Sequence, residues 1–373
     1  MVEQQYVALN DPAQFGAVVQ AWGARWPSMG LFVMLPEQEK QHVPWIQGYC
    51  RDHGIALMGA VFPALVAQGG FVSEGAWLVC FAEQPDYLLQ TDLQGAGAQA
   101  LEQWTRTTLA GSKAPQTLFF IFDAMVPNVS TLLGNLHMAL DSAPRYAGVS
   151  AGSETFTPMP CLFDAQRHVG DGVLVIALGE QARTVVQHAY PVSKTLMNAT
   201  AAQGNRIIRI NDRPAFEVYQ EVIAQEYGVA LTADNFYDYA VHFPFGAVTV
   251  VDVLVRIPVA LGEDQSLVCV GEISPNTNLR LLRAPELAQS HCVAQLDAAL
   301  RSAGRPAGSA LMTFYCAGRR MHFGGESALE VQQLQETTVA QALFGALSLG
   351  EIDSVEDLDV PRFHNAAMVC IAA

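Results

Sequence analysis

Apolar runs alternate with polar turns along this chain, and the period of the apolar positions switches between two and 3.6 residues. The clearest example lies near the C-terminus. Leu311–Cys316 predicts a strand, the amphipathic stretch Glu326–Leu343 predicts a helix, and Phe344–Leu349 and Ala366–Ile371 predict two more strands. The expected order of elements in this stretch is therefore strand, helix, strand, strand.

Two upstream stretches, residues 31–81 and 118–178, show the same order of apolar patterns. In each of the three stretches a glycine follows the start of the first strand at a similar interval, after 28, 30 and 34 residues for Gly59, Gly148 and Gly345. Similar spacing with the same element order indicates duplicated units. We therefore predict an α/β fold of repeated strand–helix–strand–strand units that form mixed, largely antiparallel sheets flanked by helices.

The region between the second and third units has a different pattern. Arg206–Ile210 predicts a strand, Pro214 opens a predicted helix that runs to about Gln225, and two β-branched runs follow at Gly246–Ile257 and Ser266–Glu272. We expect the boundary near residues 190–205, where Pro191 and Gly204 flank a polar stretch. We predict two domains, residues 1–195 and 196–373.

The composition narrows the class of protein. Hydrophobic residues make up 51% of the 373 residues and charged residues only 15%, which is typical of a folded chain with a large core. The net charge is −16 and no cluster of Lys and Arg is present, so we expect neither nucleic acid nor an anionic membrane as a partner. No apolar stretch reaches the roughly 18–20 residues of a spanning helix. The N-terminus lacks a secretory pattern, so we expect a cytoplasmic protein.

Polar residues gather where the predicted C-terminal strands end, and these residues are Cys316, Arg319, Glu351, His364 and Asn365. Placement at strand ends avoids the desolvation penalty of burying a charge within a strand. One interpretation is structural, with a buried Arg–Glu pair capped by the asparagine. The other is a polar rim that binds a small zwitterion or anion, in which Arg319 holds a carboxylate and Glu351 an amine.

The sequence resembles a known family. The run Phe314–Arg319 has the form F-x-C-x-G-R, and together with the later Gly350-Glu351 and His364-Asn365 it resembles the C-terminal part of the FIST sensory domain. Four upstream segments are similar to the N-terminal part of that domain: Gly148–Gly152, Gly172–Leu178, Gly204–Ile207 and Asn211–Ala215. The resemblance extends from about residue 10 to the end of the chain.

The resemblance implies a sensor rather than an enzyme. A small-molecule ligand would bind in a cleft between the two parts of the chain, and the signal would pass to a separate protein such as a histidine kinase or a diguanylate cyclase. One branch of the family consists of stand-alone, haem-binding sensors of nitric oxide. For such a haem cofactor, His188 and His242 are the candidate ligands of the metal, since both lie among aromatic and β-branched residues. His188 precedes the expected boundary, so a ligand there would touch both parts.

Two alternatives from other classes stay open. The first is a hydrolase or transferase that uses Ser150 or Cys316 as its nucleophile. Gly148–Gly152 has the form G-x-S-x-G, but that motif works on a turn between a strand and a helix, and Pro158 and Pro160 make a following helix improbable. Cys316 next to Arg319 is also a candidate redox sensor, although its place at the end of an apolar strand favours burial. The second alternative is an interaction scaffold without a ligand.

Overall fold

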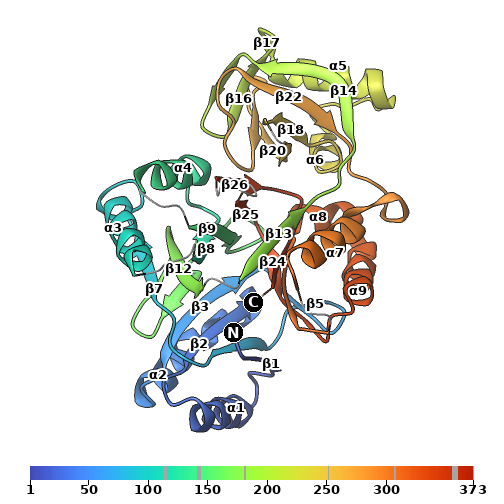
Figure 1. Cartoon of the computed structure of the whole chain (residues 1–373). Coiled ribbons are helices and arrows are strands. Elements are labelled where there is room, and N and C mark those ends of the chain that lie inside the picture. The colour runs from blue at the N-terminus through green and yellow to red at the C-terminus, as the bar shows by residue number, and fades with distance from the viewer. Residues whose placement is uncertain are drawn as a thin grey trace.

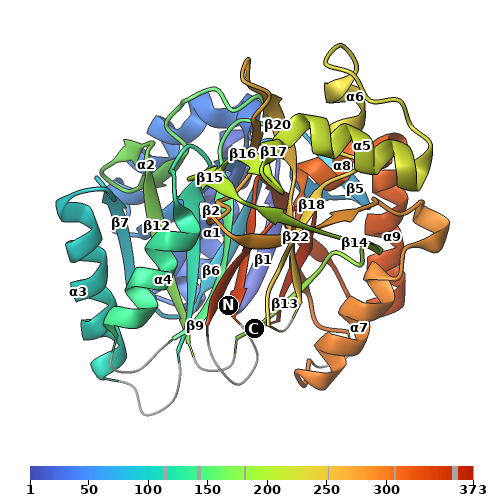
Figure 2. The same ribbon diagram turned by 90° about the horizontal axis from the view of Figure 1, so that it is seen from above.

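The computed structural model describes residues 1–111, 116–140, 144–179, 182–250, 252–305, 308–354 and 360–372. Figure 1 shows two parts, a large body and a smaller part above it that is formed by residues 192–282. The view from above in Figure 2 shows the strands of the body on the inside and its helices around them. No helix in the described ranges is both long and apolar enough to cross a membrane.

The body contains three repeats of one order of elements. The first consists of β1 (Glu3–Val7), α1 (Pro12–Arg25), β2 (Gly30–Pro36), α2 (Val43–Asp52), β3 (Ala56–Phe62), β4 (Leu65–Ala67), β5 (Gly70–Val72) and β6 (Ala76–Phe81). The second consists of β7 (Tyr87–Thr91), α3 (Ala96–Ala110), β8 (Thr117–Asp123), α4 (Val129–Ala139), β9 (Arg145–Ala151), β10 (Leu162–Asp164), β11 (His168–Val169) and β12 (Gly172–Gly179).

The third repeat consists of β13 (Arg183–Gln187), α7 (Cys292–Ser302), β23 (Leu311–Cys316), α8 (Ala317–Phe323), α9 (Ser327–Thr338), β24 (Leu343–Ser348), β25 (Glu351–Ser354), β26 (Pro361–His364) and β27 (Met368–Ala372). In every repeat two central strands are parallel, as β23 and β24 are, and the last strand runs antiparallel beside the first of them. The predicted α/β fold with mixed, largely antiparallel sheets is confirmed.

Each repeat donates a two-stranded hairpin to the sheet of another repeat. The three sheets have the orders β1-β6-β2-β3-β10-β11, β7-β12-β8-β9-β25-β26 and β13-β27-β23-β24-β4-β5. The hairpin of the first repeat thus completes the third sheet, that of the third completes the second, and that of the second completes the first. The repeats therefore form a closed cycle. The sequence pattern did not predict this exchange, because strands of two to four residues are too short to show a period.

Gly59, Gly148 and Gly345, the three glycines noted in the sequence, each pair with a residue of a donated hairpin. The residues opposite them in the ladder are Phe163 for Gly59, Ile352 for Gly148 and Val66 for Gly345. A Cβ atom at any of the three would lie less than 3.0 Å from a neighbouring ring or carbonyl oxygen, and Gly345 also has a φ of +154°. Only glycine fits such close approaches, which explains the interval seen in the sequence.

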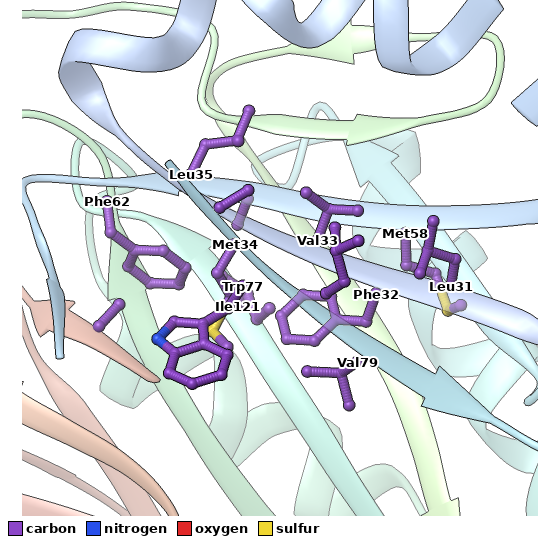
Figure 3. Packing of buried hydrophobic residues seen from close by; sticks show 14 of the residues in the cluster. Leu31, Phe32, Val33, Met34, Leu35, Met58, Phe62, Trp77, Val79 and Ile121 are labelled. Carbon is purple, nitrogen blue, oxygen red and sulfur yellow. The ribbon is translucent and has the colours of Figure 1, made fainter. Parts of the chain in front are cut away.

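The core of the body is shared by the three sheets. Figure 3 shows Met34, Phe62, Trp77 and Ile121 gathered from different strands. The ring of Phe314 lies 5.7 Å from that of Phe62 in the first repeat and 5.5 Å from a phenylalanine of the second, Phe119. Burial of each such side chain contributes about 1.5–3 kcal/mol. A large part of the stability therefore lies between the repeats.

The smaller part is inserted into the third repeat, between β13 and α7. It contains β14 (Val192–Ala199), β15 (Ala201–Gln203), β16 (Arg206–Ile210), β17 (Arg213–Pro214), α5 (Ala215–Tyr227), α6 (Phe236–Ala240), β18 (Phe245–Val248), β19 (Val253–Arg256), β20 (Pro258–Leu261), β21 (Leu267–Cys269) and β22 (Thr277–Leu282). Two small sheets, β14-β22-β18-β19 and β15-β16-β21-β20, enclose a core of their own. We call residues 192–282 the inserted part.

Two linkers join the inserted part to the body, residues 188–191 on the way out and 283–291 on the way back. The predicted boundary at residues 195–196 falls inside β14, a few residues beyond the first linker. The strand before that linker, β13, pairs with the final strand, β27. The body is thus built from both ends of the chain, and the division into domains 1–195 and 196–373 stays a prediction.

Candidate functional site

Two neighbouring cavities lie in the cleft between the body and the inserted part. The α4 cavity, of about 280 Å³, is lined by the start of α4, by Ser150 and by Gly271 and Glu272 of the inserted part. The α8 cavity, of about 250 Å³, is lined by the start of α8 and by residues of α6 and β20. The two cavities share four lining residues, Phe156, Val259, Val270 and Leu349, so they form one elongated cleft.

The floor of this cleft is made by the C-terminal ends of parallel strands. Ser150 lies near the end of β9, Cys316 ends β23, and Leu349 follows β24. Ligands of α/β proteins commonly bind in crevices at the carboxyl ends of strands, because backbone groups and short loops converge there. The position of the cleft in the fold is therefore typical of a binding site.

Arg319 forms a buried ion pair with a residue that the sequence analysis did not consider. Its guanidinium donates to both carboxylate oxygens of Glu330 on α9, at 2.7 and 2.5 Å, and both side chains are 0% exposed. The partner of Arg319 is thus Glu330 and not Glu351. The remaining donors of Arg319 reach the carbonyl oxygens of His188 and Ala366 and the hydroxyl of Ser290. This arginine has no free donor to offer a carboxylate ligand.

Glu351 is also fully buried, in a small polar cluster behind the cleft. Ser348 donates its hydroxyl to Glu351 at 2.6 Å, and the Ala367 amide donates at 3.4 Å. Burial raises the pKa of Glu351 to about 8, which the bonds from Ser348 and Cys316 only partly offset. The side chain is therefore mainly protonated at neutral pH, so it does not present the carboxylate that an amine would need.

His364 belongs to a third group, on β26 and β25. Its Nε2 lies 2.8 Å from Asp353, and the same carboxylate accepts from Arg362. Glu351 and His364 face each other across the ladder between β25 and β26. The structure thus brings the predicted rim residues into one region at the strand ends, but most of them are bonded to one another or to the backbone.

Asn365 and Cys316 are the two predicted rim residues that line the α8 cavity. Asn365 is 1% exposed; its Nδ2 donates to the His364 carbonyl oxygen, while its Oδ1 has no hydrogen-bond partner among the described residues. The Sγ of Cys316 accepts the amide N–H of Ala366 at 3.1 Å. Burial and then Glu351 raise the pKa of this thiol well above its usual value, which favours the thiol over the thiolate.

The two histidines predicted as haem ligands are bonded within the protein. Nδ1 of His188 accepts the Tyr190 amide N–H at 3.0 Å, so its Nε2 carries the proton and donates to the Val253 carbonyl oxygen at 3.2 Å. Burial, followed by the charge of His364, lowers the pKa of His188 to about 4. His242 Nδ1 lies 2.7 Å from His322 Nδ1.

These histidines do not fit a haem in the present arrangement. An axial ligand needs a ring nitrogen with a free lone pair beside an apolar cavity of several hundred Å³. His188 uses both nitrogens, and neither His188 nor His242 lines the α4 or α8 cavity. Within the described ranges no group of three or more His, Cys, Asp or Glu is placed to hold a metal ion. We derive no step through haem.

Ser150 lies in a strand rather than on an elbow. It is 2% exposed, its amide donates to the Gly350 carbonyl, and its own carbonyl accepts from Leu349. The chain after β9 passes through residues 152–161 to β10 without a helix. A nucleophile elbow needs a sharp turn from strand to helix. Ser150 lies on no such turn, so the G-x-S-x-G pattern does not form a nucleophile elbow here. The cavity walls, including Phe156, Val259 and Met321, carried no signal in the sequence.

The structure is thus a repeated α/β body with an inserted second part and a cleft between the two. Family models for the FIST N domain and the FIST C domain match residues 31–213 and 215–354. The chain therefore belongs to the FIST family, whose domains are small-ligand sensors in signalling proteins and are not known as catalytic. A comparison with the curated proteins gave no match.

Proposed function

We propose that this protein senses a small molecule that binds in the cleft between the body and the inserted part. The observation that carries the proposal is the position of α8. Ala317, Gly318 and Met321 of this helix line the α8 cavity, while Arg319 and His322 of the same helix contact the linkers. A ligand that moves α8 therefore acts directly on the connection between the two parts.

The contacts of α8 with the linkers are specific. Arg319 donates to the carbonyl of His188 in the outgoing linker and to the Ser290 hydroxyl in the returning linker. His322 Nε2 bonds the Pro285 carbonyl oxygen at 2.7 Å, also in the returning linker. A ligand with different affinities for two arrangements of α8 shifts the population between them. The orientation of the inserted part then reports whether the ligand is bound.

The receiver of this signal is, in our proposal, a separate signalling protein such as a histidine kinase or a diguanylate cyclase. The membership of the chain in a family of signalling sensors supports this class of partner. Coupling between the two binding events is reciprocal. Binding of the partner must therefore change the affinity for the small molecule by the same factor as the small molecule changes the affinity for the partner.

A pair of matched variants tests the proposal. Val259 lines both cavities and is 37% exposed, so Val259→Trp fills the cleft from its edge, while Val250→Trp places the same side chain at a fully exposed position of the inserted part. Candidate ligands are haem, free amino acids and small heterocycles, screened by thermal shift. The Soret absorption of the mixture with haem reports haem binding separately.

The second readout is the distance between spin labels at two exposed positions, Met138→Cys on α4 and Leu196→Cys on β14. A compound that binds in the cleft should change this distance in the unmodified cleft and in Val250→Trp, but not in Val259→Trp. The proposal fails if every compound that binds does so equally well to both tryptophan variants.

A further inference from the structure

We propose that the α4 end of the cleft binds the carboxylate of a small molecule with an apolar tail, and that this carboxylate takes the place of Glu272 at the start of α4. The inference rests on the proposed function, because it names the class of ligand and the contact that the ligand releases. Compared with the zwitterion that the sequence alone suggested, the ligand has no amine.

The start of α4 has backbone donors without partners. The helix contains 11 residues, and its N-cap, Asn128, makes no side-chain hydrogen bond to it. The amides of Val129 and Ser130 donate to no described residue, and both residues line the α4 cavity. Free N–H groups and the helix dipole together favour an anion at such a position.

The hydroxyl of Ser150 indicates a ligand in the same cavity independently of the helix. This serine is 2% exposed and lines the α4 cavity. Its Oγ has no hydrogen-bond partner among the described residues, yet it keeps some accessible area, unlike the occluded Oγ of Ser130. The hydroxyl of Ser150 therefore opens into the cavity. A buried hydroxyl without a protein partner is uncommon, and an acceptor oxygen of a ligand would satisfy it.

Glu272 shows that a carboxylate fits at this end of the helix. It comes from the inserted part and accepts hydrogen bonds from the amide of Thr131, at 3.0 Å, and from the hydroxyl of the same residue. Its half-buried side chain also lines the cavity. Two carboxylates on neighbouring amides of one helical turn repel each other. A ligand carboxylate on Val129, Ser130 and Ser150 therefore weakens the bonds of Glu272, which can turn to solvent.

The charges behind the cavity wall favour one negative group. Arg256 is 3% exposed and donates to backbone oxygens, so no described carboxylate forms an ion pair with it. It bonds the backbone of Glu272 and Phe363, and both residues line the cavity, so its charge lies behind the wall. Coulomb attraction acts over such a distance without contact. Asp123, a buried carboxylate on the same side, is already bonded to two backbone amides.

The apolar tail follows from the remainder of the cleft. Four apolar residues connect the α4 cavity with the α8 cavity, namely Phe156, Val259, Val270 and Leu349. Beyond them, Ile257 and Met321 contribute further apolar walls, and the one acidic lining residue, Glu154, is paired with Arg320. An apolar cavity of about 150 Å³ holds one benzene ring, so the α8 cavity of about 250 Å³ accommodates a ring. An apolar ring gains free energy on this transfer from water.

The test compares three ligands of similar shape on the full chain by isothermal titration calorimetry. They are 3-phenylpropanoate, its uncharged amide 3-phenylpropanamide, and L-phenylalanine, which adds an ammonium group to the same carboxylate. We expect saturable binding of 3-phenylpropanoate and roughly tenfold weaker binding of the amide, because hydrogen bonds to charged groups are stronger. L-phenylalanine should also bind more weakly, because its ammonium group loses hydration beside backbone donors and the charge of Arg256.

Two variants test the replacement of Glu272. Glu272→Gln keeps an acceptor for Thr131 but removes the repulsion, so 3-phenylpropanoate should bind roughly tenfold more tightly while the affinity for the amide stays the same. Glu263→Gln, at an exposed position of the same part, is the matched control and should change neither affinity. Ser150→Ala should weaken both ligands roughly threefold to tenfold.

The spin labels at positions 138 and 196 report the release of Glu272 separately. Saturating 3-phenylpropanoate should broaden their distance distribution in the protein with an unmodified cleft. In Glu272→Gln the same ligand should bind with a smaller change in the distribution, because the charged contact with Thr131 is already lost. The comparison of the three ligands on the unaltered protein needs no variant, so it stands even if a variant folds poorly.

Four outcomes overturn the inference. They are equal affinity for 3-phenylpropanoate and its amide, tighter binding of L-phenylalanine, an affinity for 3-phenylpropanoate that Glu272→Gln leaves unchanged, and no binding of 3-phenylpropanoate at all. The proposed function survives each of these results if another compound binds and is excluded by Val259→Trp but not by Val250→Trp. Only insensitivity of every bound compound to Val259→Trp counts against the proposed function itself.

Discussion

Arg319 and His188, 131 residues apart in the chain, are joined by a hydrogen bond of 2.9 Å from the guanidinium to the backbone carbonyl oxygen. The bond connects α8, which lines the α8 cavity, to the linker that leads into the inserted part. It uses the backbone of His188 and not its ring. His188 lies in the outgoing linker, and the contact that ties this linker to α8 comes from Arg319.

The first prediction concerns this arginine. Arg319→Leu leaves Glu330 buried without its partner, and we expect a loss of about 3–5 kcal/mol in the free energy of unfolding, measured by urea denaturation. The double variant Arg319→Leu, Glu330→Leu removes both charges and should be clearly more stable than the single variant. Equal stability of the single and double variants would show that the ion pair is not what holds α8 to α9.

The second prediction concerns the pH dependence of stability. Because the pKa of Glu351 is raised from its ordinary value near 4.5 to about 8, the folded state keeps a proton that the unfolded state has lost. This contribution is fully present below about pH 4.5 and is lost as pH rises towards 8, with a slope of up to about 1.4 kcal/mol per pH unit.

Glu351→Gln removes this titration and retains an acceptor for the Ser348 hydroxyl. The free energy of unfolding of the variant, relative to that of the wild type, should therefore increase from pH 5 to pH 8 and level off above. Urea denaturation of both proteins across this range measures the difference. A constant difference across the range would mean that Glu351 is ionised in the folded protein.

The third prediction concerns the glycines that pair with the donated hairpins. Gly59→Ala places a Cβ against the ring of Phe163, and Gly345→Ala places one against the Thr313 backbone at a positive φ. Both variants should be strongly destabilised or fail to fold. Gly134→Ala is the matched control, because that glycine lies inside α4 with open space around it. It should stabilise the protein by about 0.5–1 kcal/mol, as judged by the midpoint of thermal unfolding.

The fourth prediction concerns a contact that bridges the α4 side of the cleft. Glu272 of the inserted part accepts hydrogen bonds from the amide and the hydroxyl of Thr131 in the first turn of α4. The N-terminal end of a helix carries a partial positive charge, so a carboxylate is favourable there. Glu272→Ala should therefore broaden the distribution of distances between labels at positions 138 and 196. Glu263→Ala, an exposed acidic residue of the same part, should leave the distribution unchanged.

The features of the fold that could be predicted from the sequence are those that produce long apolar patterns. The three repeats, the order of their longer strands and helices, and the interval from the first strand to the glycine all follow from runs of five or more residues. The parallel pairing of the central strands was not predicted. The exchanged hairpins depend on pairing between residues far apart, which a local period does not encode. The sequence analysis expected Arg319, Glu351, His364 and Asn365 at strand ends, and in the structure these strands belong to two sheets, with β23 in the third and β25 and β26 in the second.

The partners within that region were harder to predict. Glu330 lies on the buried face of α9, together with Val331 and Leu334. A charged residue on such a face is unusual, and this was the signal in the sequence that could have identified the partner of Arg319. The cavity walls gave no comparable signal. Val259, Val270 and Met321 are ordinary apolar residues, and they line one cavity only because the inserted part lies against the body.

The exchange of hairpins also limits when each sheet can form while the chain is being synthesised. Val66 of the first repeat pairs with Gly345 of the third, so the β4–β5 hairpin leaves the ribosome long before its partner strand exists. Pairing between residues so far apart in sequence slows folding, and domains otherwise fold as they emerge. The β4–β5 hairpin of the first repeat therefore has no neighbouring strand until β24 has been synthesised. Truncation at the C-terminus would leave an open edge in the third sheet and remove a donated hairpin from the second.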